Sequence, residues 1–110
     1  FALAAKRLGY RVHVLDPEPH GPAAQVADRH VRASYDDVEA ARALAKDVAL
    51  VTFEFENVPA ATLAALESTV PVRPSAFVLE TCRHRLREKR FLERSGRPVA
   101  PFAPVSSRAE

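Results

Sequence analysis

The chain has 110 residues, of which 47% are hydrophobic and 27% are charged, and its formal net charge at pH 7 is +2. This composition is that of a globular protein with one modest core, and the nearly balanced charge argues against a nucleic-acid partner. No apolar run is long enough to span a membrane. The single cysteine, Cys82, excludes an internal disulfide framework and fits a reducing cytoplasm, where we expect the protein.

The beginning of the chain predicts half of a nucleotide-binding βαβ unit. Residues 1–8 are rich in Ala and Leu and favour a helix, which Gly9 can end. Residues 10–15 then favour a strand that Asp16 closes. A dinucleotide-binding fold places its ribose-binding acid here, but an Asp-Pro turn is the commoner meaning. The preceding strand and glycine-rich loop would lie before Phe1, and the chain contains no methionine, so we interpret it as a fragment of a longer protein.

A loop and three elements follow. Three prolines and a glycine make residues 17–22 a loop, after which residues 23–28 favour a short helix and residues 30–33 a short strand. Residues 38–46 favour a helix because Asp37, or the aspartate before it, can cap its first turn. Its apolar side chains share one face: Val38, Ala41, Leu44 and Ala45.

Residues 48–53 are apolar except for Thr52, and we expect a strand that is buried on both faces of a parallel sheet. If this strand continues to Glu56, the carboxylates of Glu54 and Glu56 point the same way, because side chains two apart share a face. Ligands of open α/β sheets bind at this carboxyl end. The two acids are either solvated groups near the start of the next helix or acceptors for ligand hydroxyl groups.

Strand and helix continue to alternate after this stretch. Residues 60–67 favour a helix and residues 70–73 a short strand, which together with the earlier elements predict an α/β fold with a parallel sheet. Ser75 can cap a short helix that reaches residue 81. A strongly basic helix over residues 83–95, closed by Gly96, then precedes an extended tail with regularly spaced prolines.

The basic helix offers a candidate anion site. Arg85 and Lys89 lie one turn apart and can hold a polyphosphate together, although a basic face is usually only a solvated face. Phe91 is the one aromatic residue nearby, so a stacking surface for nucleic acid is missing. The histidines, and Cys82 with His84, show no metal-ligand spacing, so we predict no metal site. We expect Cys82 to be a small buried hydrophobe.

Four stretches, taken together and in order, resemble one family closely. They are T-F-E-F-E-N-V-P (52–59), V-P-V-R-P-S (70–75), R-L-R-E-K-R-F-L (85–92) and G-R-P-V-A-P-F (96–102). The family is that of the N5-carboxyaminoimidazole ribonucleotide synthetases, the ATPase subunit of phosphoribosylaminoimidazole carboxylase, and the resemblance covers essentially all 110 residues. It implies an ATP-grasp ligase of purine biosynthesis that uses ATP, Mg²⁺ and bicarbonate to carboxylate aminoimidazole ribonucleotide through carboxyphosphate.

The resemblance also implies a domain organisation. Residues 1–79 would form a Rossmann-like pre-ATP-grasp domain that lacks its first strand, and residues 80–110 a connector helix and the start of the ATP-grasp domain. In the family's sheet the first strand lies between the strands 10–15 and 48–55. We therefore expect either a gap of roughly 10 Å between these two strands, about twice the usual spacing, or their collapse onto each other. We expect the full-length protein to be a homodimer, and the fragment alone to be marginally stable and inactive.

The site residues follow from the same resemblance. Arg85 matches the ATP-contacting arginine of the family, and Lys89 shares its face. Glu56, and with it Glu54, matches the edge that faces the ribonucleotide, where a carboxylate accepts hydrogen bonds from ribose hydroxyls. The family has an acid just before that arginine, where this chain has His84. The catalytic groups, the magnesium ligands and the groups that handle bicarbonate would lie outside the fragment.

Other functions stay open at this point. The formate-dependent glycinamide ribonucleotide transformylases pair a similar first domain with ATP-grasp, although F-E-F-E-N-V-P (53–59) favours the carboxylating family. A nicotinamide-dependent dehydrogenase would use Asp16 on a ribose and would have a G-x-G-x-x-G loop upstream. A non-catalytic binding module of flavodoxin-like shape would have no obvious use for the basic helix.

Overall fold

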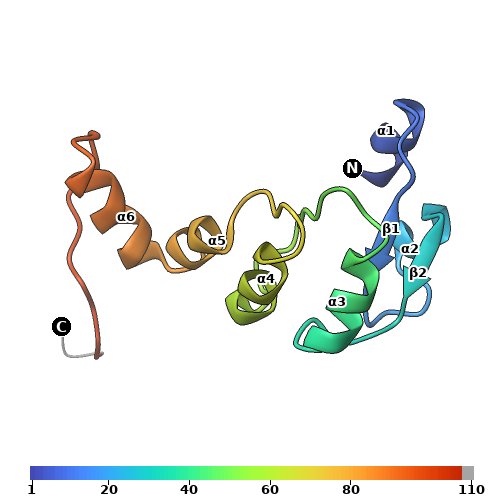
Figure 1. Ribbon diagram of the computed structural model, residues 1–110. Helices are drawn as coiled ribbons and strands as arrows, with labels where there is room; N and C mark the ends of the chain where they lie inside the picture. Colours follow the sequence, from blue (N-terminus) through green and yellow to red (C-terminus); the bar gives the residue numbers. More distant parts are fainter. Residues whose placement is uncertain (108–110) are drawn as a thin grey trace.

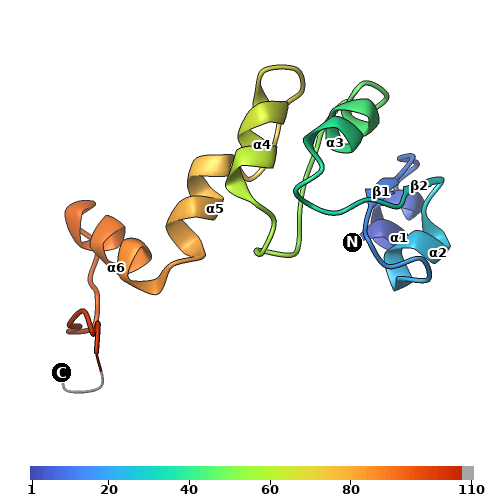
Figure 2. The ribbon, with the colours of Figure 1, turned by 90° about the horizontal axis from the view of Figure 1, so that it is seen from below.

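A computed structural model describes residues 1–107, which form an elongated molecule (Figure 1). Its radius of gyration is 16.9 Å, whereas a compact chain of this length has about 13 Å. The first helix and the two strands lie at one end and the basic helix lies at the other, in both views (Figures 1 and 2). Within residues 1–107 no helix is long and apolar enough to cross a membrane.

A small parallel sheet forms near the start of the chain. Its two strands are β1 (His13–Leu15) and β2 (Arg29–Val31), with Val14 opposite His30. The helices α1 (Ala2–Arg7) and α2 (Pro22–Val26) contact each other beside it. The predicted order of helix, strand, helix and strand is therefore confirmed, although both strands are shorter than the sequence predicts.

Glycine ends two helices, as the sequence predicts. Gly9 follows α1 with a φ of +86°, and Gly96 follows α6 (Arg85–Arg94) with a φ of +68°. This left-handed conformation lets backbone N–H groups turn back onto the last carbonyl groups of the helix, and it disfavours residues with a Cβ atom.

The stretch 48–53 is not the long, doubly buried strand that its composition predicts. Only Val51 forms a β-bridge, a parallel one to Val72. The Val51 N–H donates to the Pro71 carbonyl at 2.9 Å, and the Arg73 N–H donates to the Val51 carbonyl at 2.9 Å. Leu50 is 51% exposed. A buried strand needs neighbours on both sides to pair its backbone, and this segment has one among the described residues.

The two parallel pieces are not joined into one sheet. No backbone hydrogen bond links β1 to residues 48–53 in the part of the chain that the structure describes. The two segments therefore do not pair with each other through their backbones. Leu15 and Phe53 nevertheless pack against the same hydrophobic core, so side chains bridge the break in the hydrogen bonding.

That core lies mainly among three helices. The helix α4 (Ala60–Glu67), which has the predicted bounds, contacts both α3 (Val38–Ala45) and α5 (Ala76–Cys82) (Figure 2). Val72 and Leu79 are the most deeply buried of the large side chains, at 0% and 1% exposure. Of the stripe expected on α3, Ala41, Leu44 and Ala45 are buried.

Side-chain caps fix where these helices begin. The Asp37 carboxylate accepts a hydrogen bond from the Ala40 N–H at 2.9 Å, and the Ser75 hydroxyl accepts one from the Val78 N–H at 3.4 Å. The sequence predicts both caps. A third group adds to them: the Glu67 carboxylate, at the end of α4, accepts from the Ala76 N–H at 2.8 Å and so ties α4 to α5.

One carboxylate connects α1 to the loop before β2. The Lys6 ammonium and the Val12 N–H each donate to Asp28 at 2.8 Å. The hydrogen bond from Lys6 is the main reason, and that from Val12 the next, why the pKa of Asp28 lies below its ordinary value of 3.8.

This shift predicts the pH dependence that Asp28 gives to folding. Because its pKa is depressed in the folded chain, the stabilisation is complete above the ordinary pKa of 3.8 and is lost as the pH falls through the lower folded value. We expect Asp28→Asn to be less stable than the wild type at neutral pH. Below about pH 4 its stability should fall by less than that of the wild type, because the titrating carboxylate is gone. Urea denaturation at both pH values measures this. Asp36→Asn, at an exposed aspartate, is the control, and an unchanged pH dependence in Asp28→Asn would contradict the prediction.

Candidate functional site

The candidate site lies where the chain leaves β1 and the Val51 bridge, at the carboxyl ends of both parallel pieces. Asp16 directly follows β1, and the segment from Glu54 to Glu56 follows the bridge. Tyr35, from the loop between β2 and α3, contacts both of these places. Residues from three distant parts of the sequence thus meet at one edge of the molecule.

Glu54 and Glu56 are both exposed, but they do not continue a strand. Residue 54 lies in a bend, and residues 56–57 lie in a turn before α4. The strand therefore does not reach Glu56, contrary to what the sequence indicates, because the backbone pairing is confined to Val51. The two carboxylates are presented by a loop, in which strand alternation does not set their directions.

Asp16 ends β1 as a turn residue. Its Oδ1 accepts a hydrogen bond from the Glu18 N–H at 2.7 Å, and its Oδ2 accepts one from the Tyr35 hydroxyl at 3.3 Å. The backbone is held as well, because the Asp16 N–H donates to the Val31 carbonyl. The turn interpretation of Asp16 is confirmed. Both carboxylate oxygens have partners within the protein, so the acid that the dehydrogenase hypothesis needs for a ribose is already engaged.

Tyr35 and Phe55 form the aromatic part of the site. Their ring centroids lie 5.6 Å apart at an interplanar angle of 42°, within the range of favourable aromatic pairs. Burial raises the pKa of Tyr35, and the negative charge of Asp16 and their hydrogen bond raise it further. Tyr35 therefore remains a protonated donor at neutral pH. No sequence pattern points to Tyr35, because a single aromatic residue in a loop has no recognisable spacing or periodicity.

The predicted ATP-binding residues lie elsewhere, on α6 at the far end of the molecule (Figure 1). The Arg85 side chain is 78% exposed, and its Nη1 donates to Glu88 at 2.6 Å. The Lys89 ammonium lies 5.5 Å from the centroid of the Phe102 ring, a cation–π contact. The two cations have separate partners, and the structure does not bring them together on one acceptor.

His84 is the N-cap residue of α6 and makes no side-chain cap hydrogen bond. An acid at this place accepts well from the first-turn N–H groups. His84 thus leaves the first turn of the helix that carries Arg85 without a side-chain cap. The start of this helix is two residues later than the sequence predicts, since it begins at Arg85.

Cys82 is exposed at the end of α5, so the expectation of a buried thiol is wrong. The face of α5 that packs on the core carries Ala76 and Leu79, and Cys82 is three residues further on, in the last turn. Among residues 1–107, no three His, Cys, Asp or Glu side chains lie together as a metal site requires.

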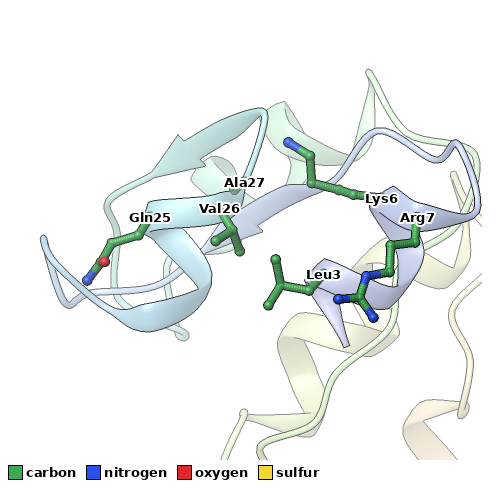
Figure 3. A pocket seen from close by; sticks show the side chains of 6 residues that line it. All are labelled: Leu3, Lys6, Arg7, Gln25, Val26 and Ala27. Carbon is green, nitrogen blue, oxygen red and sulfur yellow. The ribbon is translucent and has the colours of Figure 1, made fainter.

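Two surface hollows are lined by residues other than the predicted site residues. One, of about 530 Å³, lies between α1 and α2 and is lined by Leu3, Lys6, Arg7, Gln25, Val26 and Ala27 (Figure 3). Another, of about 470 Å³, lies between α6 and the tail, where Arg90, Arg97 and Phe102 contribute to its wall. Neither of these two hollows is lined by Glu54, Glu56, Arg85 or Lys89.

Comparison with known proteins defines the class of this chain. The model of the ribonucleotide synthetase preATP-grasp domain matches residues 1–83, which is most of the chain. The chain belongs to this family, and the predicted α/β, Rossmann-like fold class is confirmed.

Similar proteins and solved structures include several N5-carboxyaminoimidazole ribonucleotide synthases. The synthase of Pseudomonas aeruginosa is 47% identical over 109 residues, which are 99% of this chain and 30% of the relative. The crystal structure of the synthetase from Thermus thermophilus matches with a TM-score of 0.88 at 42% identity, over 98% of this chain and 30% of its own. The resemblance seen in the sequence is thereby confirmed, and the chain spans about 30% of the length of these relatives.

A third match was solved with ligands. The N5-carboxyaminoimidazole synthase from Aspergillus clavatus, in complex with ADP and 5-aminoimidazole ribonucleotide, has a TM-score of 0.80 at 36% identity. The match covers 90% of this chain and 27% of the Aspergillus chain. That enzyme binds both a nucleotide and a ribonucleotide.

Proposed function

We propose that this chain is part of an N5-carboxyaminoimidazole ribonucleotide synthase, an ATP-dependent ligase of purine biosynthesis, and that it supplies an edge facing the ribonucleotide. The observation that carries this proposal is the loop with the two exposed carboxylates, Glu54 and Glu56, in a chain 47% identical to such a synthase. The complete enzyme would carboxylate aminoimidazole ribonucleotide with bicarbonate.

The complete enzyme would carry out this reaction in two steps. A bicarbonate oxygen attacks the γ-phosphorus of ATP, and ADP leaves, which gives carboxyphosphate. The amine of the ribonucleotide then attacks the carboxyl carbon, inorganic phosphate leaves, and the amine loses a proton. No residue among those described is assigned to these bond changes.

The part assigned to this chain is binding. Ionised carboxylates only accept hydrogen bonds, and they repel phosphate, so Glu56 and Glu54 suit the ribose hydroxyls rather than the 5′-phosphate. Their exposure leaves them free to meet a ligand at the carboxyl ends of the strands, where ligands of open α/β sheets bind.

We assign Arg85 and Lys89 to the ATP side of the enzyme. The basic character of α6 and the high exposure of Arg85 support this assignment. For ATP to bind, Arg85 would exchange its surface ion pair with Glu88 for a phosphate, which costs little because exposed ion pairs contribute little. The described residues form no cluster that fits Mg²⁺, so we assign the magnesium ligands to other parts of the enzyme.

We place a domain boundary between residues 79 and 80, with the pre-ATP-grasp domain over residues 1–79 and the connector and the start of ATP-grasp over residues 80–110. The break between α5 and α6 at residues 83–84 and the end of the family match at residue 83 both lie near this boundary. A homodimer of the complete enzyme belongs to the same proposal.

The test is an activity assay of the full-length enzyme that contains this chain. We expect ADP release that requires aminoimidazole ribonucleotide and bicarbonate together. Formate with glycinamide ribonucleotide should give none, which separates the enzyme from the transformylases. ADP release with the second pair, or none with the first, would contradict the proposed function.

The same assay tests the ATP assignment. Because Arg85 is exposed and its attraction to phosphate is screened, we expect Arg85→Ala to raise the Michaelis constant for ATP by less than about tenfold and to leave that for the ribonucleotide unchanged. Arg94→Ala, on the last turn of the same helix, is the matched control. Equal Michaelis constants for ATP in the variant and the wild type would remove Arg85 from the ATP site.

A further inference from the structure

The loop that carries Glu54 and Glu56 has few attachments. Among residues 1–107, no backbone hydrogen bond ties residues 52–57 to another segment; the last such bonds before the loop are those of Val51. Phe53 packs against the core on one side of the loop, and Val58 is buried on the other. Between these ends, the ring contact that the structure describes is that of Phe55 with Tyr35.

Tyr35 itself has two attachments to the rest of the chain. Its ring packs against the hydrophobic core, and its hydroxyl donates to Asp16. Asp16 is fixed in turn by the Glu18 N–H, and its carbonyl oxygen lies 3.0 Å from His30 Nε2. A chain of contacts thus runs from Asp16 at the end of β1, through Tyr35, to Phe55, which lies between the two glutamates in the sequence.

We propose that Tyr35 and Phe55 are positioning residues for the ribonucleotide: the ring pair, anchored on Asp16, holds the loop so that Glu56 faces the ribose hydroxyls. This rests on the proposed function of Glu56. An unanchored loop would have to be ordered when the ligand binds, and that entropy cost would appear as weaker binding. The anchor contacts neither the ribonucleotide nor ATP in this scheme, and it acts through Glu56 alone.

The experiment uses the full-length synthase and compares Phe55→Ala and Phe55→Tyr, each with and without Glu56→Ala. Loss of an aromatic pair predicts that Phe55→Ala raises the Michaelis constant for the ribonucleotide by about two- to twelvefold. The Michaelis constant for ATP should not change, and Phe55→Tyr, which keeps a ring, should behave as wild type. In the Glu56→Ala background, Phe55→Ala should give no further rise, because the group that it positions is gone.

The Michaelis constants of these variants either support or overturn the positioning role. A rise that is selective for the ribonucleotide and absent in the Glu56→Ala background supports the positioning role. An unchanged Michaelis constant in Phe55→Ala, or an equal rise with and without Glu56, overturns it, even if Glu56→Ala alone impairs ribonucleotide binding. A fall in turnover with both Michaelis constants raised would show a merely structural role and overturn it too. If no ribonucleotide-dependent activity exists in the wild type, the proposed function fails, and the positioning role fails with it.

Discussion

Leu79→Ala is expected to destabilise the folded chain by about 2–5 kcal/mol. Leu79 is 1% exposed and belongs to the core formed with Leu63, Leu66 and Val72. Truncation removes buried apolar surface and leaves a cavity that the helices α4 and α5 can fill only in part. Because a domain of this size is marginally stable, a loss of this magnitude would unfold a large fraction of the molecules.

Urea denaturation followed by circular dichroism measures the effect. The matched control is Val78→Ala, at the neighbouring position on α5, where the side chain is 40% exposed. We expect the control to change the free energy of unfolding by no more than about 0.5 kcal/mol. Equal effects of the two substitutions would mean that α5 does not pack on α4 through Leu79.

The helices could be predicted because their signals are local. The bounds of α4 follow from the sequence, and the caps at Asp37 and Ser75 act on N–H groups three residues away. Glycine at positions 9 and 96 marks helix ends for the same local reason.

The strand around Val51 could not be predicted in the same way. An apolar, β-branched stretch indicates that a strand is favourable, but a strand also needs a partner on each side, and partners are set by distant parts of a sheet. Val51 has one partner, Val72, and the extended pairing over residues 48–53 is lost. The burial of Cys82 was predicted from its residue type alone, and the prediction is wrong because Cys82 is the last residue of α5 and is exposed there.

The candidate site was predicted in part. The sequence singles out Glu54 and Glu56, since two acids after an apolar stretch are unusual enough to notice. The contacts that hold their loop were missed, because they join positions 16, 35 and 55. No periodicity or spacing links these positions, and only the fold brings them together.

Glu56→Ala, in the full-length synthase, is expected to raise the Michaelis constant for the ribonucleotide by about ten- to a hundredfold. The basis is the loss of a hydrogen bond to a charged acceptor, about 1.5–3 kcal/mol. We assign ATP to α6, at the other end of the molecule, so the Michaelis constant for ATP should not change. Glu39→Ala, at a largely exposed glutamate on α3, is the control and should leave both constants at their wild-type values.

The most direct measurement is a calorimetric titration of the full-length synthase with aminoimidazole ribonucleotide, for the wild type and for Glu56→Ala, followed by a titration of both with ATP. If the carboxylate at this edge accepts hydrogen bonds from the ribose, Glu56→Ala binds the ribonucleotide about ten- to a hundredfold more weakly and binds ATP as the wild type does. Equal ribonucleotide affinities in the two proteins would contradict the assignment and would leave Glu56 as a solvated acid before α4.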